Sequence, residues 1–79
     1  MPHIAVKMLK GRTDEQKRKL ADALAAAMQQ TIGAAPTHIT VSIEDYTPAE
    51  WQEQFRNEVT DRPQENIFIK PQYDPKDLL

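Results

Sequence analysis

The strongest constraint on the fold is a long helical segment between two short runs whose side chains alternate. In residues 2–9, Ile4, Val6 and Met8 fall on one face of the run, which is the pattern of a strand. Residues 39–44 alternate in the same way. A strand, a helix and a strand in this order predict a β-α-β unit with two parallel strands and a right-handed crossover.

The helical segment carries a start signal and a stop signal. Thr13 followed by Gln16 matches a capping box, and Gly33 is placed to end the helix about 18 residues later. An apolar stripe with the i, i+4, i+7 spacing is expected to pack on the sheet. Its members are Leu20, Leu24, Ala27, Met28 and Ile32.

The second half of the chain is less regular. Thr47 and Glu50 form another helix opening, which predicts a short helix over residues 48–57. That helix would turn Trp51 and Phe55, four residues apart, to the same side. Residues 66–70 fit either a short strand or a last helical turn, and the proline-containing tail beyond them is expected to be mobile or to lie on a partner.

Length and composition predict one small domain that does not stand alone. The chain has 79 residues, which gives a single domain over residues 1–79 of the α+β class, and it contains no cysteine to form a disulfide. A chain of this size buries a modest core, and two strands alone make no stable sheet. We therefore expect a homo-oligomer that completes the sheet.

Charge and hydropathy exclude several classes of partner. A net charge of −2 gives no electrostatic footprint for nucleic acid, and the basic run at residues 17–19 lies among acidic residues on an expected helix face. No apolar run approaches the ~20 residues of a membrane span, and no secretory signal precedes the first strand. These patterns predict a cytoplasmic protein with no nucleic-acid or membrane partner. No metal-ligand spacing and no phosphate-binding glycine loop are present, so no metal or cofactor is expected.

Pro2 and Arg12 are the candidates for chemistry. Pro2 either merely begins the strand or becomes the N-terminus, where its secondary amine can act as a base. Arg12 follows the strand, so within one chain the two groups lie near opposite ends of it, roughly 25 Å apart. They can meet only across a subunit boundary or if the chain folds back.

Three features occur together in this chain: Pro2 directly after the initiator Met, the β-α-β layout, and the block Gly11-Arg12-Thr13-Asp14-Glu15-Gln16-Lys17. In this combination the chain resembles the 4-oxalocrotonate tautomerase family. The resemblance covers residues 2–51. Longer-chain, dimeric, phenylpyruvate-type members are the most similar, because they share a Pro-x-x-Trp segment, here Pro48-Ala49-Glu50-Trp51, and a C-terminal extension.

The resemblance implies a cofactor-independent isomerase that moves a proton between carbon and oxygen of a small 2-keto or enol acid. Pro2 matches the family's general base, Arg12 its substrate-binding arginine, and Trp51 an aromatic residue that makes the pocket apolar. The chemistry is reasonable, because desolvation and a nearby cation lower the pKa of an α-amine from about 7.7–8.0 and keep it neutral. An arginine fork suits a carboxylate and stabilises an enolate.

One position departs from the family's pattern. Hexameric members carry a second arginine in the second strand, where this chain has Thr40, and a hydroxyl cannot replace a guanidinium charge. We therefore expect an arylpyruvate-like monocarboxylate substrate and favour a dimer, with a hexamer still possible. Arg56 or Arg62 could compensate, although nothing in the spacing requires it.

Two alternatives to a tautomerase stay open. The first is a non-catalytic oligomer of the same fold that binds a small acid or serves as a scaffold, since an attached Met1 would turn the Pro2 nitrogen into an amide. The second is a related hydratase, decarboxylase or dehalogenase, because one base and one arginine serve several enolate chemistries.

Overall fold

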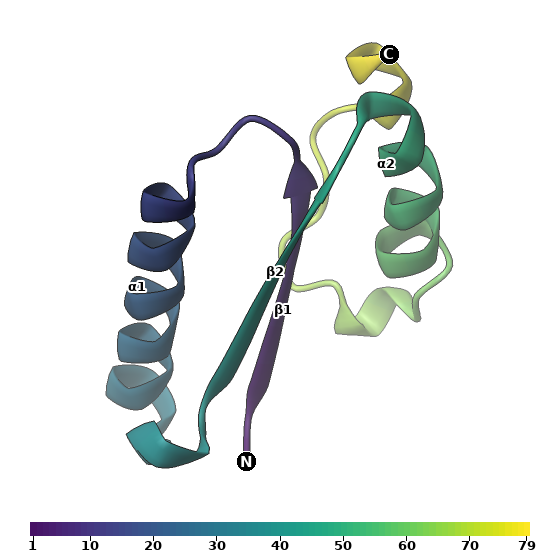
Figure 1. Ribbon diagram of the computed structural model, residues 1–79. Coiled ribbons are helices and arrows are strands. Elements are labelled where there is room, and N and C mark those ends of the chain that lie inside the picture. The colour runs from purple at the N-terminus through teal and green to yellow at the C-terminus, as the bar shows by residue number, and fades with distance from the viewer. The chain divides into compact units, whose positions relative to one another are not determined.

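The computed structural model describes residues 1–79, which divide into two compact units, Met1–Asp45 and Tyr46–Leu79. Figure 1 shows the order of the elements along the chain. The expectation of a single domain over residues 1–79 stays a prediction.

The first unit is the β-α-β motif that the alternation predicts. Strand β1 (His3–Leu9) leads into helix α1 (Asp14–Ile32), a short 3₁₀ turn (Pro36–His38) follows, and strand β2 (Thr40–Tyr46) then pairs with β1. The two strands run in the same direction, with α1 as the crossover between them (Figure 1). The α+β fold class and the parallel pairing are confirmed.

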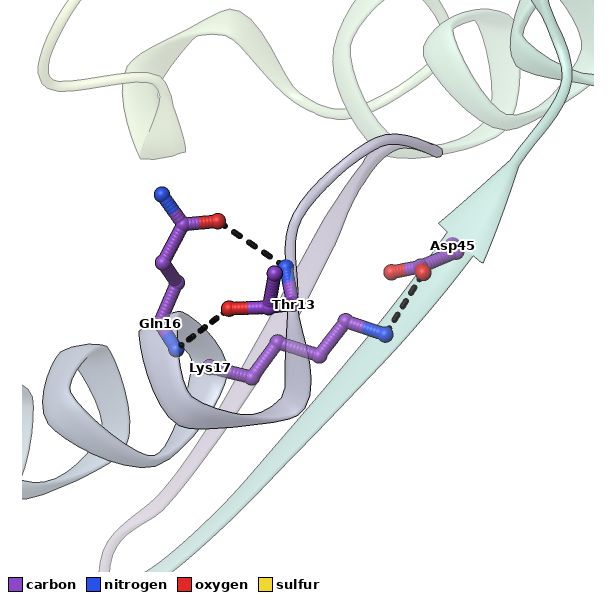
Figure 2. A network of polar contacts seen from close by, with 4 residues as sticks. All are labelled: Thr13, Gln16, Lys17 and Asp45. Atoms are coloured by element: carbon purple, nitrogen blue, oxygen red, sulfur yellow. Dashed lines mark hydrogen bonds and ion pairs between the residues drawn. The ribbon is translucent and has the colours of Figure 1, made fainter.

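Local signals fix both ends of α1. The Thr13 hydroxyl accepts a hydrogen bond from the Gln16 amide at 3.1 Å, and the Thr13 amide donates to Gln16 Oε1 at 2.9 Å (Figure 2). Gly33 takes a left-handed conformation (φ 71°), and its amide donates to the Gln29 carbonyl at 3.0 Å. A residue without a Cβ adopts this conformation at little cost, which is why the helix ends there.

The inward face of α1 differs in part from the expected stripe. Leu20, Leu24 and Met28 are half-buried as predicted, but Ala27 and Ile32 are exposed, Ile32 by 67%. Lys17, Ala21 and Ala25 are half-buried instead. At about 100° per residue, Ala27 lies about 90° from the middle of this face, and Ile32 is the last residue of the helix.

An ion pair joins the first turn of α1 to the end of β2. Lys17 Nζ lies 2.6 Å from Asp45 Oδ2, and only 25% and 21% of the two side chains are exposed (Figure 2). The other carboxylate oxygen, Asp45 Oδ1, is buried without a hydrogen-bond partner. Removing the Lys17 charge would therefore leave a carboxylate that water reaches poorly.

The second unit is built on helix α2 (Pro48–Phe55), which begins with a second capping box. The Thr47 amide donates to Glu50 Oε1 at 2.8 Å, and the Glu50 amide donates to the Thr47 hydroxyl at 3.2 Å. The predicted end near residue 57 is two residues late, because the chain leaves α2 as a π turn (Arg56–Thr60). The Asp61 amide donates a hydrogen bond to the Arg56 carbonyl at 2.8 Å, which closes this turn.

The tail contains neither of the two structures left open for residues 66–70. Asn66 ends a 3₁₀ turn (Gln64–Asn66), and the residues after it form bends, with Phe68 and Ile69 exposed by 92% and 90%. Farther along, Gln52 Nε2 donates to the Pro75 carbonyl at 2.8 Å. This part of the tail therefore lies on α2 of its own chain.

Three aromatic rings pack against one another in the second unit, and the middle one is buried. Phe55 is the one buried apolar side chain of the whole chain, with 8% exposed. Its ring centroid lies 6.5 Å from that of Trp51 and 5.6 Å from that of Tyr73. The Trp51 indole N–H donates to the Tyr73 hydroxyl at 3.1 Å. The expectation that Trp51 and Phe55 face the same side is confirmed.

Replacing Lys17 with Met should lower the free energy of unfolding by about 1–2 kcal/mol, because the half-buried Asp45 loses its partner. Urea denaturation followed by circular dichroism measures the change. Lys19→Met is the matched control on the same helix, since its pair with Glu15 at 3.4 Å is more than three-quarters exposed and should contribute below about 0.5 kcal/mol. Equal losses in the two variants would contradict a structural role of the Lys17–Asp45 pair.

Replacing Tyr73 with Ala should shift the fluorescence emission of Trp51 to longer wavelength, because the indole loses its partner and meets more water. Trp51 is the chain's single tryptophan, so the signal is unambiguous. Tyr73→Phe keeps the ring against Phe55 and should leave the emission near that of the wild type. An unchanged spectrum in Tyr73→Ala would argue against the packing of the tail on α2.

Candidate functional site

Pro2 lies one residue before β1, at the end of the two-stranded sheet where both strands begin. It is half-buried, and its carbonyl oxygen accepts a hydrogen bond from the Thr40 amide at 3.2 Å. Proline has no amide hydrogen to donate, so placing it at the start of the strand removes no hydrogen bond between the strands. Met1, which precedes it, is 87% exposed. The Pro2 nitrogen is thus held on a paired strand, with an accessible residue attached.

Polar side chains next to Pro2 form a row that we did not single out from the sequence. His3 Nδ1 lies 2.6 Å from the Thr40 hydroxyl, and His3 Nε2 lies 3.4 Å from the Ser42 hydroxyl. We call these three residues the His3 row. Alternation places His3 on one face of β1 and Thr40 and Ser42 on one face of β2, so parallel pairing of the two runs would have revealed it.

Arg12 lies at the other end of β1. It is exposed in the turn between β1 and α1, directly after Gly11, whose φ of 132° is favourable only for glycine. The seven residues of β1 separate it from Pro2, which is roughly 23 Å at a strand rise of about 3.3 Å. One copy of this unit therefore does not bring Pro2 and Arg12 together.

Trp51 belongs to the second unit, where it lines an apolar cavity of about 420 Å³ that is largely open to solvent. Phe55, Tyr73 and Val59 contribute further apolar wall, and Lys70 adds one cationic side chain. The Lys70 ammonium donates to the Gln64 carbonyl at 2.9 Å. A cavity of this size and lining suits the ring of a small aromatic molecule.

The two arginines considered as substitutes for a second strand arginine lie in the second unit. Arg62 is engaged by Glu58, whose carboxylate lies 3.0 Å away. Arg56 is exposed at the start of the π turn. Thr40, the position of the missing charge, uses its hydroxyl for the contact with His3.

The structure contains no group of three or more His, Cys, Asp or Glu side chains that could hold a metal ion. None of its helices combines the length and the apolar content that crossing a bilayer requires.

Comparisons with known proteins agree on one family. The Tautomerase family, described as "Tautomerase enzyme", matches residues 2–54. A probable tautomerase of Xylella fastidiosa is 34% identical over 73 residues, which cover 92% of this chain and 89% of that protein. A 2-hydroxymuconate tautomerase of Bacillus subtilis is 51% identical over 45 residues, which cover 57% and 73% of the two chains.

Solved structures agree. The crystal structure of TomN, a 4-oxalocrotonate tautomerase homologue in the tomaymycin biosynthetic pathway, is 34% identical and superposes with a TM-score of 0.61 over 63% of this chain and 77% of the other. The match of the family to 53 residues, more than half of the chain, and the long alignment with the Xylella protein are sufficient to assign the family. The chain belongs to the tautomerase family and, within it, to the 4-oxalocrotonate tautomerases, and it is accordingly an enzyme of the isomerase class.

Proposed function

We propose that the protein catalyses keto–enol tautomerisation of a small 2-keto acid, with the N-terminal proline as general base. The observation that supports this most is that the family match begins at Pro2. The carbonyl of this residue accepts a hydrogen bond from the Thr40 amide at the end of the sheet where both strands begin. Removal of the exposed Met1 frees the Pro2 nitrogen as a secondary amine. The rigid ring then limits where the lone pair points.

The reaction needs one group that accepts a proton and returns it. In the enol-to-keto direction, the enol hydroxyl loses a proton and the adjacent carbon gains one, so no net change in protons occurs. The Pro2 nitrogen carries the proton between the two positions and is regenerated. Arg12 binds the substrate carboxylate through paired hydrogen bonds and stabilises the negative charge that develops on the enolate oxygen.

The substrate that fits best carries a single carboxylate and an aromatic ring. Thr40 supplies no second cation, and its hydroxyl is already used by His3. Trp51 stands where the resemblance to the family implies an aromatic residue that makes the substrate pocket apolar. We therefore propose an arylpyruvate of the phenylpyruvate type and expect a higher kcat/KM for phenylenolpyruvate than for the dicarboxylate 2-hydroxymuconate, each followed by its ultraviolet absorbance.

The active form is a homo-oligomer in which two chains build each site, and a dimer is the simplest arrangement. Pro2 and Arg12 lie at opposite ends of β1 in one chain, so a shared substrate requires the Arg12 of a second copy. The chain buries a single apolar side chain, Phe55, and leaves Phe68 and Ile69 exposed. A core this small needs further burial for stability, which association with another copy supplies.

Replacing Pro2 with Ala should lower kcat/KM for phenylenolpyruvate by about 10²- to 10⁴-fold while circular dichroism stays unchanged, because the general base changes and loses its rigid ring. Intact mass of the wild-type protein should be lower than the full sequence by one methionine. Pro36→Ala, at the start of the 3₁₀ turn, is the matched control and should keep full activity. A fully active enzyme that retains Met1, or an active Pro2→Ala variant, would contradict the proposal.

Replacing Arg12 with Ala should lower kcat/KM about a hundredfold, because the carboxylate and the enolate lose their charged donor. Arg18→Ala, an exposed arginine on α1, is the control that should change little.

The Pro2→Ala and Arg12→Ala variants should also restore activity to each other when they are mixed. Each mixed dimer of Pro2→Ala and Arg12→Ala chains contains one intact site, so about a quarter of the wild-type activity should return after joint refolding. Activity that merely averages the two variants would place both groups of a site in one chain.

A further inference from the structure

The row of His3, Thr40 and Ser42 lies directly beside the proposed base and has no role in the reaction described above. His3 is joined to Pro2 by a peptide bond, and its two ring nitrogens lie 2.6 Å and 3.4 Å from the hydroxyls of Thr40 and Ser42. Both hydroxyls come from the neighbouring strand β2. The row therefore ties the first residue of β1 to β2 through side chains as well as through the backbone.

We propose that His3 is a positioning residue, which fixes the Pro2 nitrogen by anchoring the peptide that follows it. This inference rests on Pro2 as the base. The peptide plane between Pro2 and His3 is held at one end by the Thr40 amide, which donates to the Pro2 carbonyl at 3.2 Å. The ring of His3 holds the other end against the Thr40 hydroxyl.

Two anchors leave Pro2 little freedom. Once Met1 is removed, the position of the nitrogen depends on the orientation of this peptide plane and on the proline ring, which is rigid. Terminal residues fray unless they are tied down. Proton transfer requires a contact within hydrogen-bond reach, so a shift of about 1 Å in a reacting group is enough to slow the reaction many-fold.

The two hydrogen bonds of the His3 row can form in every protonation state of the imidazole. A hydroxyl both donates and accepts, so each one takes the role complementary to the ring nitrogen beside it, in either tautomer or in the protonated ring. The anchoring is therefore expected to act on kcat at all pH values at which the protein is folded. Both ring nitrogens face the hydroxyls of Thr40 and Ser42, so the ring has no nitrogen left to bind the substrate and KM should change little.

His3→Ala should lower kcat about tenfold and change KM less than about twofold, measured with phenylenolpyruvate. His3→Asn keeps a polar atom near the position of Nδ1, which makes the shorter contact to Thr40, and should restore most of the loss. His3→Gln places its polar group near the position of Nε2, which makes the longer contact to Ser42, and should restore less. His38→Ala, the only other histidine, lies in the 3₁₀ turn and is the matched control that should keep the wild-type kcat.

A double-mutant cycle tests the link to Thr40. Thr40→Val removes the hydroxyl and keeps the backbone amide that binds the Pro2 carbonyl, so it should resemble His3→Ala. The double variant should be no slower than either single variant, because both remove the same contact. Multiplied losses in the double variant would overturn the anchoring role, as would a raised KM with unchanged kcat.

The outcomes separate this inference from the proposed function. If Pro2→Ala is inactive while His3→Ala and Thr40→Val retain the wild-type kcat, the positioning role is wrong and the base assignment stands. If Pro2→Ala is fully active, the base assignment fails and the positioning role fails with it. Thermal unfolding of each variant is measured in parallel. Should His3→Ala unfold at the assay temperature, Thr40→Val decides the question, and a wild-type kcat in that variant overturns the inference.

Discussion

The pairing of two parallel strands is the constraint on which the rest of the first unit depends. Parallel strands cannot be joined by a tight turn, so a crossover helix is required, and α1 supplies it. The same geometry brings the starts of both strands to one end of the sheet, which places Pro2 beside Thr40. It also carries Arg12 to the opposite end. A single backbone arrangement thus explains the neighbours of the proposed base and is the reason for proposing that a second chain supplies Arg12 to each site.

The crossover helix is held by contacts of two kinds. Leu20, Leu24 and Met28 are the large apolar side chains that α1 half-buries, and none of them is fully buried. The Lys17–Asp45 pair adds a polar contact between the start of α1 and the end of β2 (Figure 2). A two-stranded sheet with one helix offers little apolar surface to bury, so a single ion pair with limited solvent access carries unusual weight.

Local sequence signals predicted the fold better than they predicted the site. Both capping boxes and the glycine at the end of α1 follow from neighbouring residues, and the structure confirms them. The exposure of Ala27 depends on how α1 is rotated over the sheet, which no local pattern specifies. The His3 row likewise joins residues 37 and 39 positions apart, so it appears only when the register of the two strands is known. Family resemblance indicated Pro2, Arg12 and Trp51, whereas their surroundings required coordinates.

The π turn after α2 has a consequence for the aromatic cavity. In an α-helix, a residue four positions later lies about 40° further around the axis, so Val59 would drift away from the line of Trp51 and Phe55. The wider turn at Arg56–Thr60, closed by an i to i+5 hydrogen bond, reverses part of that drift, and Val59 lines the same cavity as the two rings. The place of Val59 in the cavity wall therefore depends on the number of residues in one turn of backbone, and an insertion or deletion there would move it out of line with the two rings.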